Sequence, residues 1–408
     1  MYRRNIVQSI FESRADTPVQ LLVGARQTGK STLALQIAGK EGIPYRTLDD
    51  ATVLSAAASD PEGFLRGLGD RAVIDEVQRV PDLLLAIKAS VDKDRQPGKY
   101  LLTGSSNIMT LPRISESLAG RVEVHTLRPL SQGEIEGNRE HFIDTLFEKT
   151  PDIKVELDKN LMQKRVVRGG YPEVLTREKI ARRRAWFESY ISTVLSRDVR
   201  DIANIEHLNQ LPRLLSLLAA RNGSMLNYSE LSNSSALPQS TLKRYLGILE
   251  KLFIFEPLPA WSSNRGKRLV KSPKVFISDC GLSASLLGIG GERLGDNELS
   301  YGPLLEAFVL GELRKQSGWT EGRYRLYHYR SASGNEVDVV VESADGSLVG
   351  LEVKGKVSVK ANDFKGMHAL KEHTGSRFMR GIILYSGEKT VAFSEKMAAV
   401  PIAALWKI

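Results

Sequence analysis

Residues 19–37 read VQLLVGARQTGKSTLALQI, and the architecture of the N-terminal part of the chain follows from this segment. A mostly apolar run is followed by a loop that contains glycine and then by a pattern typical of a helix. Similar apolar runs return at residues 72–77 (AVIDEV), 99–105 (KYLLTGS) and 122–127 (VEVHTL), with helical patterns between the first two of them. Short apolar strands that alternate with helices predict βα units and a parallel sheet, and thus an α/β fold.

The loop after the first strand fits the pattern G-x-x-x-x-G-K-[ST] at residues 24–31. Its glycines let the backbone come close to a ligand, so that N–H groups of the loop and of the helix N-terminus can surround phosphate oxygens. We expect Lys30 to reach the β- and γ-phosphates of a nucleoside triphosphate and the Ser31 hydroxyl to ligate magnesium. A purely structural glycine-rich turn is the alternative. The pattern predicts that the chain binds ATP and Mg²⁺ through Gly24, Ala25, Arg26, Gln27, Thr28, Gly29, Lys30, Ser31 and Thr32.

Polar residues at the ends of two further strands extend this prediction. Asp75 and Glu76 follow an apolar strand, and we expect Asp75 to hold the magnesium shell and Glu76 to orient and polarise the attacking water. The strand segment KYLLTGSSN (99–107) ends in hydroxyl and amide groups, which suit a sensor of the γ-phosphate. Ser105 is the first candidate for that role and Asn107 the second. An ordinary turn at a strand end is the alternative for each of them.

In their order and spacing, GARQTGKS, VIDEV, LLTGSS and SLAGRVEV resemble the AAA-type ATPases of bacteria and archaea that carry a C-terminal domain of unknown function. The resemblance continues through RGGYPEV (168–174) and SYISTVLSRDV (189–199) and covers nearly the whole chain. It implies ATP hydrolysis. It also points to Arg121 as an arginine that completes the catalytic site of a neighbouring subunit in a homo-oligomer. Action of Arg121 within its own subunit and capping of a helix C-terminus are open alternatives.

Positive charge is concentrated in the middle of the chain. The net charge is +9, and residues 161–280 contain twenty Lys and Arg against ten Asp and Glu, whereas residues 1–130 contain seventeen against fifteen. A basic surface of this kind suits a polyanionic partner such as DNA. A well-solvated surface without a partner is the alternative.

Residues 226–260 resemble a winged helix-turn-helix, with a helix near Ser229, a turn, a second helix that begins at Pro238, and then a hairpin. We expect the second helix to face a DNA groove and the turn SSNRGKR (262–268) to contact phosphates. Winged helices also bind proteins, which is the alternative. The predicted DNA-binding residues are Lys243, Arg244, Arg265, Lys267 and Arg268.

A third constellation lies near the C-terminus. Glu306 falls on a predicted helix and Asp338 on a strand, and alternation puts Glu352 and Lys354 on one face of the next strand. An acid followed by E-x-K resembles the PD-(D/E)XK nuclease core, in which carboxylates bind magnesium and a lysine polarises the attacking water. An inert or degenerate nuclease-like domain is the alternative.

At 408 residues the chain exceeds the roughly 250–300 residues that one core supports, so several domains are expected. We predict a P-loop AAA-type ATPase domain at 1–130, a helical lid or linker at 131–205, a winged helix at 206–275 and a restriction-endonuclease-like α/β domain at 276–408. No stretch resembles a signal peptide or a transmembrane helix, which predicts a cytoplasmic protein without a membrane partner.

These features favour an ATPase coupled to DNA binding or processing. Two other functions are considered. The first is a nucleotide-dependent switch that binds DNA or protein and carries an inactive nuclease-like domain. The second is a P-loop kinase for a small substrate, which the adjacent Asp75 and Glu76 and the polar end of the third strand argue against.

Overall fold

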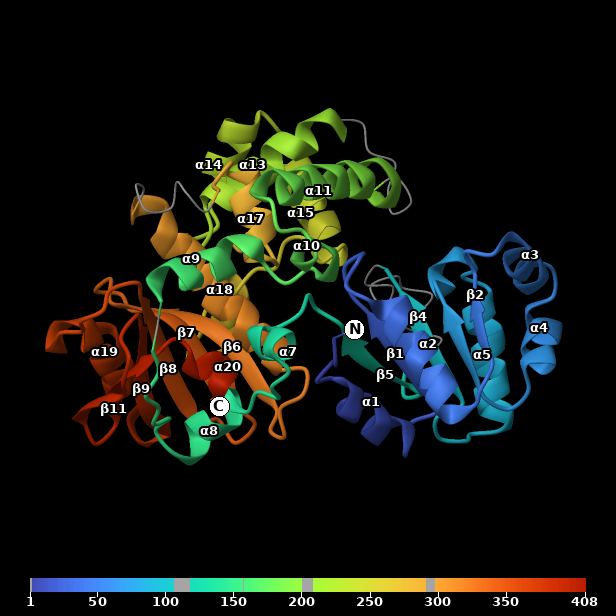
Figure 1. Cartoon of the computed structure of the whole chain (residues 1–408), viewed down its shortest axis with the longest axis horizontal. Helices are drawn as coiled ribbons and strands as arrows, with labels where there is room; N and C mark the ends of the chain where they lie inside the picture. Colours follow the sequence, from blue (N-terminus) through green and yellow to red (C-terminus); the bar gives the residue numbers. More distant parts are fainter. Residues whose placement is uncertain (1, 106–117, 157, 200–207, 291–297) are drawn as a thin grey trace. The chain divides into compact units, whose positions relative to one another are not determined.

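A computed structural model describes residues 2–105, 118–156, 158–199, 208–290 and 298–408. The chain forms two compact units (Figure 1). The first comprises residues 3–130 with 251–253, and the second comprises residues 131–250 and 254–408. No helix in these described ranges is long and apolar enough to cross a lipid bilayer.

The first unit contains a five-stranded parallel sheet, which confirms the predicted α/β fold. The strand order is β2-β3-β4-β1-β5, so that β4 lies between β1 and β3. The strands are β1 (Val19–Val23), β2 (Tyr45–Thr47), β3 (Ala72–Asp75), β4 (Tyr100–Gly104) and β5 (Val122–Thr126).

The central strands of this sheet are apolar because helices cover it. All of β1 is buried, and Val19, Leu21 and Val23 belong to one core together with residues of α4 and α5. The helix that follows β1, α2, contacts β3 and β4. The helices of this unit are α1 (Val7–Arg14), α2 (Lys30–Glu41), α3 (Ala51–Ser59), α4 (Pro61–Leu68), α5 (Leu83–Lys93) and the short 3-10 helix η1 (Val77–Arg79).

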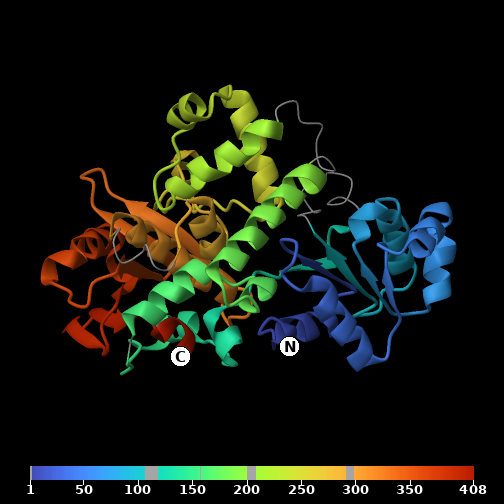
Figure 2. The ribbon, with the colours of Figure 1, turned by 45° about the horizontal axis from the view of Figure 1, so that its top comes forward.

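The second unit begins with helices. Helix α13 illustrates why, because Leu211, Leu214, Leu215 and Leu218 recur at helical spacing and are all fully buried. In Figures 1 and 2 the helices from α11 to α15 gather on one side of this unit. The helices before residue 252 are α7 (Gln132–Glu136), α8 (Phe142–Glu148), α9 (Lys159–Arg168), α10 (Pro172–Leu175), α11 (Ile180–Thr193), the π-helix η3 (Val194–Asp198), η4 (Leu208–Gln210), α13 (Leu211–Ala220), α14 (Tyr228–Ser235) and α15 (Gln239–Lys251).

A six-stranded mixed sheet forms the other part of this unit, with the order β10-β11-β9-β8-β7-β6. β7 is antiparallel to both β6 and β8, whereas β9 is parallel to both β8 and β11, and β10 is antiparallel to β11. The strands are β6 (Tyr324–Arg330), β7 (Glu336–Ser343), β8 (Leu348–Lys354), β9 (Phe378–Tyr385), β10 (Val391–Ser394) and β11 (Met397–Pro401). The remaining helices are α16 (Arg265–Val270), α17 (Cys280–Leu286), α18 (Glu298–Gln316), η5 (Ala361–Phe364), α19 (Lys365–Thr374), η6 (Gly375–Arg377) and α20 (Ala404–Lys407).

The predicted hairpin turn at SSNRGKR is instead a short helix, α16, and this corrects the expectation. Asn264 caps this helix, because its side chain accepts a hydrogen bond from the backbone N–H of Lys267 at 3.2 Å. On either side of α16, residues 254–260 and 272–278 pair in antiparallel fashion through isolated bridges. The assignment of residues 206–275 to a winged helix stays a prediction.

Candidate functional site

The ends of three parallel strands meet at one edge of the first sheet. Val23 of β1 lies opposite Gly104 of β4, and Ile74 of β3 lies opposite Leu102 of β4. Each strand therefore ends at nearly the same level. As a result, the loop at 24–29, the pair at 75–76 and Ser105 all begin at this edge, where open α/β sheets bind their ligands.

The loop has the backbone that its glycines require. Gly24 has a φ of 150°, and a Cβ atom there would lie 2.2 Å from the Leu127 carbonyl oxygen, so no other residue fits without a shift of the backbone. Gly29, with a φ of 95°, precedes the first residue of α2. Arg26 is partly exposed, Gln27 is exposed with a φ of 65°, and the Thr28 hydroxyl donates to the carbonyl oxygen of Ala25 at 2.9 Å.

Lys30 is folded over this loop. Its ammonium donates to the carbonyl oxygens of Gly24 at 3.0 Å and of Ala25 at 2.9 Å, and the side chain is buried. Ser31 and Thr32 follow it in the first turn of α2, where Ser31 is half-buried and Thr32 is exposed. The ammonium therefore lies at the loop that is expected to hold phosphate.

Hydroxyl groups from both neighbouring strands hold the Asp75 carboxylate. Tyr45 and Thr47 of β2 donate to its Oδ2 at 2.9 and 3.3 Å, and Thr103 of β4 donates to its Oδ1. Burial, together with the charge of Asp75, raises the pKa of Tyr45, so this hydroxyl stays protonated and remains a donor. A carboxylate at this edge provides the kind of oxygen donor that Mg²⁺ prefers.

Gln78, which is not among the residues predicted from the sequence, links two of the predicted residues, Glu76 and Ser105. Its Nε2 donates to the Glu76 carboxylate and, at 3.0 Å, to Oγ of Ser105. Glu76 has a left-handed backbone with a φ of 59°, and its N–H donates to Thr103 Oγ1 at 3.0 Å. A left-handed backbone conformation is strained for a residue other than glycine, and such strain often marks a functional position. The second candidate for the sensor role, Asn107, lies outside the described residues.

Arg121 lies at the N-terminal ends of the strands, opposite the ends at which the loop and Asp75 lie. Its carbonyl accepts the N–H of Val19, the first residue of β1, whereas the loop follows the last residue of that strand. Its side chain pairs with Asp92 at 2.5 Å and donates to the Ala119 carbonyl at 2.9 Å. This position disfavours contact of Arg121 with the nucleotide of its own subunit. Capping of a helix C-terminus and a role in a neighbouring subunit both stay predictions for Arg121.

The C-terminal residues meet in the second unit, but as ion pairs. Lys274, which the sequence analysis missed, donates to Glu306 Oε1 at 2.7 Å and to Asp338 Oδ1 at 3.3 Å. Lys354 donates to Glu352 Oε1 at 2.9 Å. Among the described residues, no group of three or more His, Cys, Asp or Glu side chains is arranged to hold a metal ion. Glu306, Asp338, Glu352 and Lys354 were predicted to form one site, and the structure places them together. Lys274 lies among them as a fifth residue.

The charges of this cluster depend on one another. Burial, reinforced by Asp338, raises the pKa of Glu306 and that of Glu352, whereas the Lys274 and Lys354 ammonium groups oppose the rise in Glu306 and Glu352, respectively. Burial alone lowers the pKa of Lys274, but Asp338 and Glu306 together raise it above its ordinary value. Lys274 therefore carries its positive charge at neutral pH, and the cluster contains its own counter-charge.

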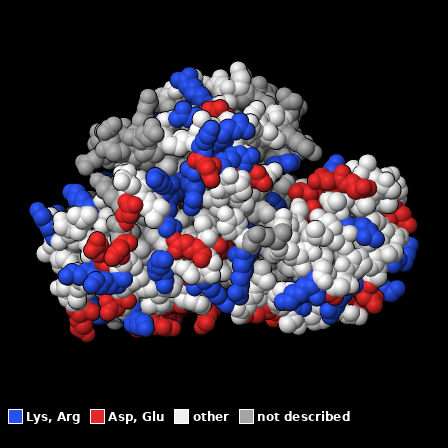
Figure 3. Space-filling view, viewed as in Figure 1, with Lys and Arg blue, Asp and Glu red and all other residues white. Residues whose placement is uncertain are grey.

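The predicted DNA-binding residues have three different outcomes in the structure. Lys243, Arg244 and Lys267 are exposed, and Figure 3 shows Lys and Arg side chains gathered over the helical part of the second unit. Arg268 corrects the prediction, because its guanidinium forms a bidentate pair with Glu342 at 2.6 and 2.9 Å and stacks over Tyr327. A guanidinium held in this way is not available to a phosphate. The side chain of Arg265 lies outside the described residues.

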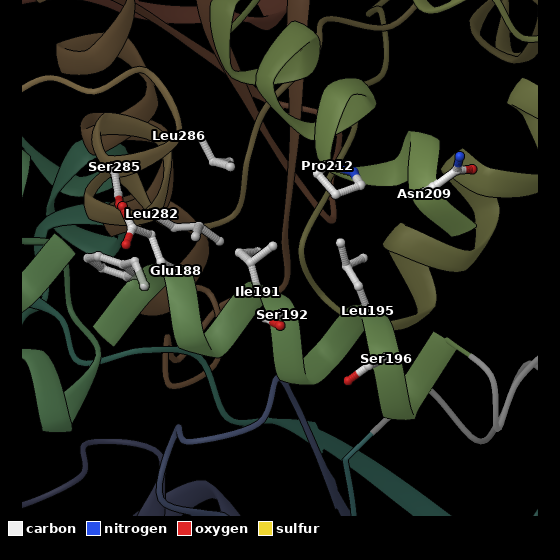
Figure 4. A pocket seen from close by; sticks show the side chains of 11 residues that line it. Glu188, Ile191, Ser192, Leu195, Ser196, Asn209, Pro212, Leu282, Ser285 and Leu286 are labelled. Carbon is white, nitrogen blue, oxygen red and sulfur yellow. The ribbon is translucent and has the colours of Figure 1, made fainter. Parts of the chain in front are cut away.

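A cavity of about 720 Å³ lies elsewhere in the second unit. Ile191 and Leu195 project into it from α11 and η3, opposite Leu282 of α17 (Figure 4). Glu188 is the one charged side chain among the described residues that line it. The lining does not provide the convergent polar groups of a catalytic site.

Three family models match the chain. An AAA domain matches residues 16–136, a domain of unknown function (DUF8612) matches residues 159–293, and a domain of unknown function (DUF4143) matches residues 301–405. The AAA match contains the loop, the Asp75–Glu76 pair and Ser105.

The chain is also similar to whole proteins. Uncharacterized proteins of Mycobacterium bovis and Mycobacterium tuberculosis are each 31% identical over 400 residues, which cover 98% of this chain and 83% of the relative. An uncharacterized protein of Haemophilus influenzae is 24% identical over 372 residues, or 85% of each protein. A Walker-type ATPase of Pyrococcus abyssi is 16% identical with a TM-score of 0.41, over 70% of this chain and 96% of that chain. The mycobacterial similarity extends far beyond the AAA domain.

Proposed function

The chain belongs to the family that joins an AAA domain to a C-terminal DUF4143 domain, and from this we propose that it hydrolyses ATP with Mg²⁺ at the edge where β1, β3 and β4 end. The AAA domain is a nucleotide-binding ATPase domain. The register of the three strands carries the proposal, because the phosphate loop, two adjacent acids and a serine begin at one level.

Each side chain has a separate task in this proposal. Lys30 exchanges its hydrogen bonds to the Gly24 and Ala25 carbonyls for bonds to the β- and γ-phosphates. Ser31 and Asp75 would hold magnesium, which neutralises charge on these phosphates when bound. Glu76 accepts a hydrogen bond from the attacking water, and Ser105 donates one to the γ-phosphate. The test is release of free phosphate that requires Mg²⁺ and that candidate acceptor substrates do not divert. Phosphorylation of an added acceptor would instead support the kinase.

Gln78 is the positioning residue for Glu76 in this site. Replacing Gln78 by alanine removes the hydrogen bonds to the Glu76 carboxylate and to Ser105, so we expect kcat to fall by about 10-fold, the cost of one charge-assisted hydrogen bond. The Kd for ATP is expected to stay near that of the wild type, because Gln78 is proposed to contact no phosphate. Steady-state kinetics and nucleotide titration measure the two quantities. A loss of affinity with unchanged kcat would assign Gln78 to binding rather than to positioning.

The exposed basic side chains of α15 and α16 are proposed to bind DNA through its phosphates. Three observations support this proposal: the excess of positive charge in residues 161–280, and the exposure of the α15 pair Lys243 and Arg244 and of Lys267 in α16. Arg268 has no part in it, because Glu342 already holds its guanidinium.

Replacing Lys243, Arg244 and Lys267 together by alanine is expected to weaken DNA binding and to flatten its salt dependence. Each phosphate that is no longer neutralised lowers the slope of log K against log salt by about 0.9, so the slope of the triple variant is smaller by roughly 2 to 3. The matched control replaces three exposed basic residues of the first unit, Lys40, Arg66 and Lys93, and keeps the wild-type slope. Equal slopes of log K against log salt in both triple variants would show that the basic residues of α15 and α16 do not bind DNA phosphates.

The alternative, a nucleotide-dependent switch that binds DNA or protein without cutting, is favoured by one observation. The carboxylates of the nuclease-like cluster are already paired with lysines. ATP turnover measured with and without DNA, followed by a gel of the same DNA, separates the two functions. Stimulated turnover with intact DNA supports the switch, and cut DNA supports processing.

A further inference from the structure

Glu306, Asp338 and Glu352 are acids of the kind that bind metal ions, but a lysine, Lys274, lies between two of them. The Lys274 ammonium lies 2.7 Å from Glu306 Oε1 and 3.3 Å from Asp338 Oδ1, so it bridges an acid of α18 and an acid of β7. The side chain of Lys274 is only 5% exposed. A divalent ion bound to the same two acids would need oxygen atoms at about 2.0–2.6 Å and would occupy the same space.

Two further oxygen atoms of the cluster also accept hydrogen bonds. Asp338 Oδ2 accepts the backbone N–H of Val353 at 3.0 Å, and Glu352 Oε1 accepts Lys354 Nζ at 2.9 Å. Gly223 lies against Glu306, because a Cβ atom at residue 223 would be 2.7 Å from Glu306 Oε2. The carboxylates are therefore engaged from several sides, and the residues do not fit a bound metal ion.

The backbone holds Lys274 in this place. Its N–H donates to the carbonyl of Leu258 at 2.9 Å, and its carbonyl accepts the N–H of Leu258 at 3.0 Å. On the other side Lys274 forms an antiparallel bridge with Met225. The backbone of a residue paired on both sides cannot move away without breaking these contacts. Its buried side chain then holds the ammonium against Glu306 and Asp338, so the ammonium is a built part of the cluster.

We infer that Lys274 is the built-in cation of this acidic cluster and takes the position that a divalent metal would need, so that the C-terminal domain binds no metal there while Lys274 is in place. Removing the ammonium then leaves two adjacent carboxylates with an empty position between them. Hard divalent cations prefer such a pair of carboxylate oxygens. The inference depends on neither ATP hydrolysis nor DNA binding.

The experiment is a Mn²⁺ titration of the full chain without nucleotide, followed by electron paramagnetic resonance of free Mn²⁺. Without nucleotide phosphates, the proposed magnesium site of the first unit lacks most of its ligands. We expect no site in the wild type that depends on Asp338, and one additional site per chain in Lys274→Ala. The double variant Lys274→Ala, Asp338→Asn is expected to lose this site again. Lys271→Ala removes an exposed lysine of the same segment and is the matched control without an additional site.

Stability provides a second measurement that does not depend on counting sites. The variant Lys274→Gln keeps much of the length of the side chain and a hydrogen-bond donor but leaves the acids without their counter-charge. We expect its Tm to be lower than that of the wild type and to rise when Mn²⁺ is added, because a ligand that binds only the folded state stabilises it. Added Mn²⁺ is expected to change the Tm of the wild type no more than it changes the Tm of Asp338→Asn.

Two results would overturn the inference. One is a Mn²⁺ site in the wild type that Asp338→Asn removes, which would show that metal and Lys274 coexist or that the metal displaces the lysine. The other is a folded Lys274→Ala chain, judged by circular dichroism and a cooperative melting curve, that acquires no site. If Lys274→Ala does not fold, the wild-type titration and the Lys274→Gln melting curves decide the question.

Discussion

Replacing Glu76 by glutamine is expected to slow ATP hydrolysis by roughly 10²- to 10⁴-fold, the usual contribution of a positioned acid or base. Glutamine has the same shape, so the left-handed backbone and the contact with Gln78 can persist, but the amide cannot accept the proton of the attacking water. The Kd for ATP is expected to stay close to that of the wild type, because Glu76 is proposed to face the water and not the phosphates. Phosphate release under single-turnover conditions, together with nucleotide titration, measures both quantities.

The control for this variant is Glu62→Gln, which neutralises an exposed acid of α4 in the same unit. It is expected to hydrolyse ATP at the wild-type rate. Wild-type turnover in Glu76→Gln would show that another residue positions the water, and the role assigned to Glu76 would be withdrawn.

Replacing Lys30 by alanine is expected to raise the Kd for ATP by roughly 10- to 150-fold. This range corresponds to about 1.5–3 kcal/mol, the contribution of one hydrogen bond to a charged group. The ammonium is already at the loop, where it donates to the carbonyls of Gly24 and Ala25. Its loss removes the charge that would face the β- and γ-phosphates. Titration of the nucleotide-free chain with a fluorescent ATP analogue gives the Kd directly.

Lys40→Ala is the matched control for Lys30→Ala, because it removes a lysine near the other end of α2 that is exposed. Its Kd is expected to be unchanged. Melting curves show whether Lys30→Ala remains folded, since its two carbonyl partners lose a donor. An unchanged Kd in a folded Lys30→Ala chain would contradict phosphate binding by this loop.

Two variants at one edge of the sheet thus separate binding from hydrolysis. Lys30→Ala is expected to lose affinity, and Glu76→Gln is expected to lose turnover while it keeps affinity. A chain that only uses nucleotide as a structural ligand would show the first effect and not the second. The pair therefore tests the ATPase proposal independently of the C-terminal domain.

The N-terminal site could be anticipated from the sequence because its parts are local. Gly24, Gly29 and Lys30 are close in the chain, and an apolar strand before them restricts where the loop can lie. The pair Asp75 and Glu76 lies at the end of another such strand. Parallel strands end at a common edge of their sheet, so the strand pattern was sufficient to bring these residues together.

Contacts between distant residues could not be anticipated in this way. Gln78 follows Glu76 by only two residues, but its link to Ser105 depends on β4 lying between β1 and β3. Arg268 looked like a free basic residue of a turn until Glu342, 74 positions away, was found to hold it. The sequence around a basic residue does not show whether its side chain will pair with an acid or face the solvent.

The sequence determined the features that depend on neighbouring residues, and the tertiary structure determined those that depend on contacts between distant residues. The amino-acid order alone determined the phosphate loop, the acids at the end of β3, the parallel sheet, and the alternation that puts Glu352 and Lys354 on one face of β8. Only the tertiary structure showed that Lys274 lies between Glu306 and Asp338, which are 32 and 64 residues away. Motifs of adjacent residues follow from local backbone geometry, whereas the neutralisation of a buried acid depends on which distant segment the fold packs against it.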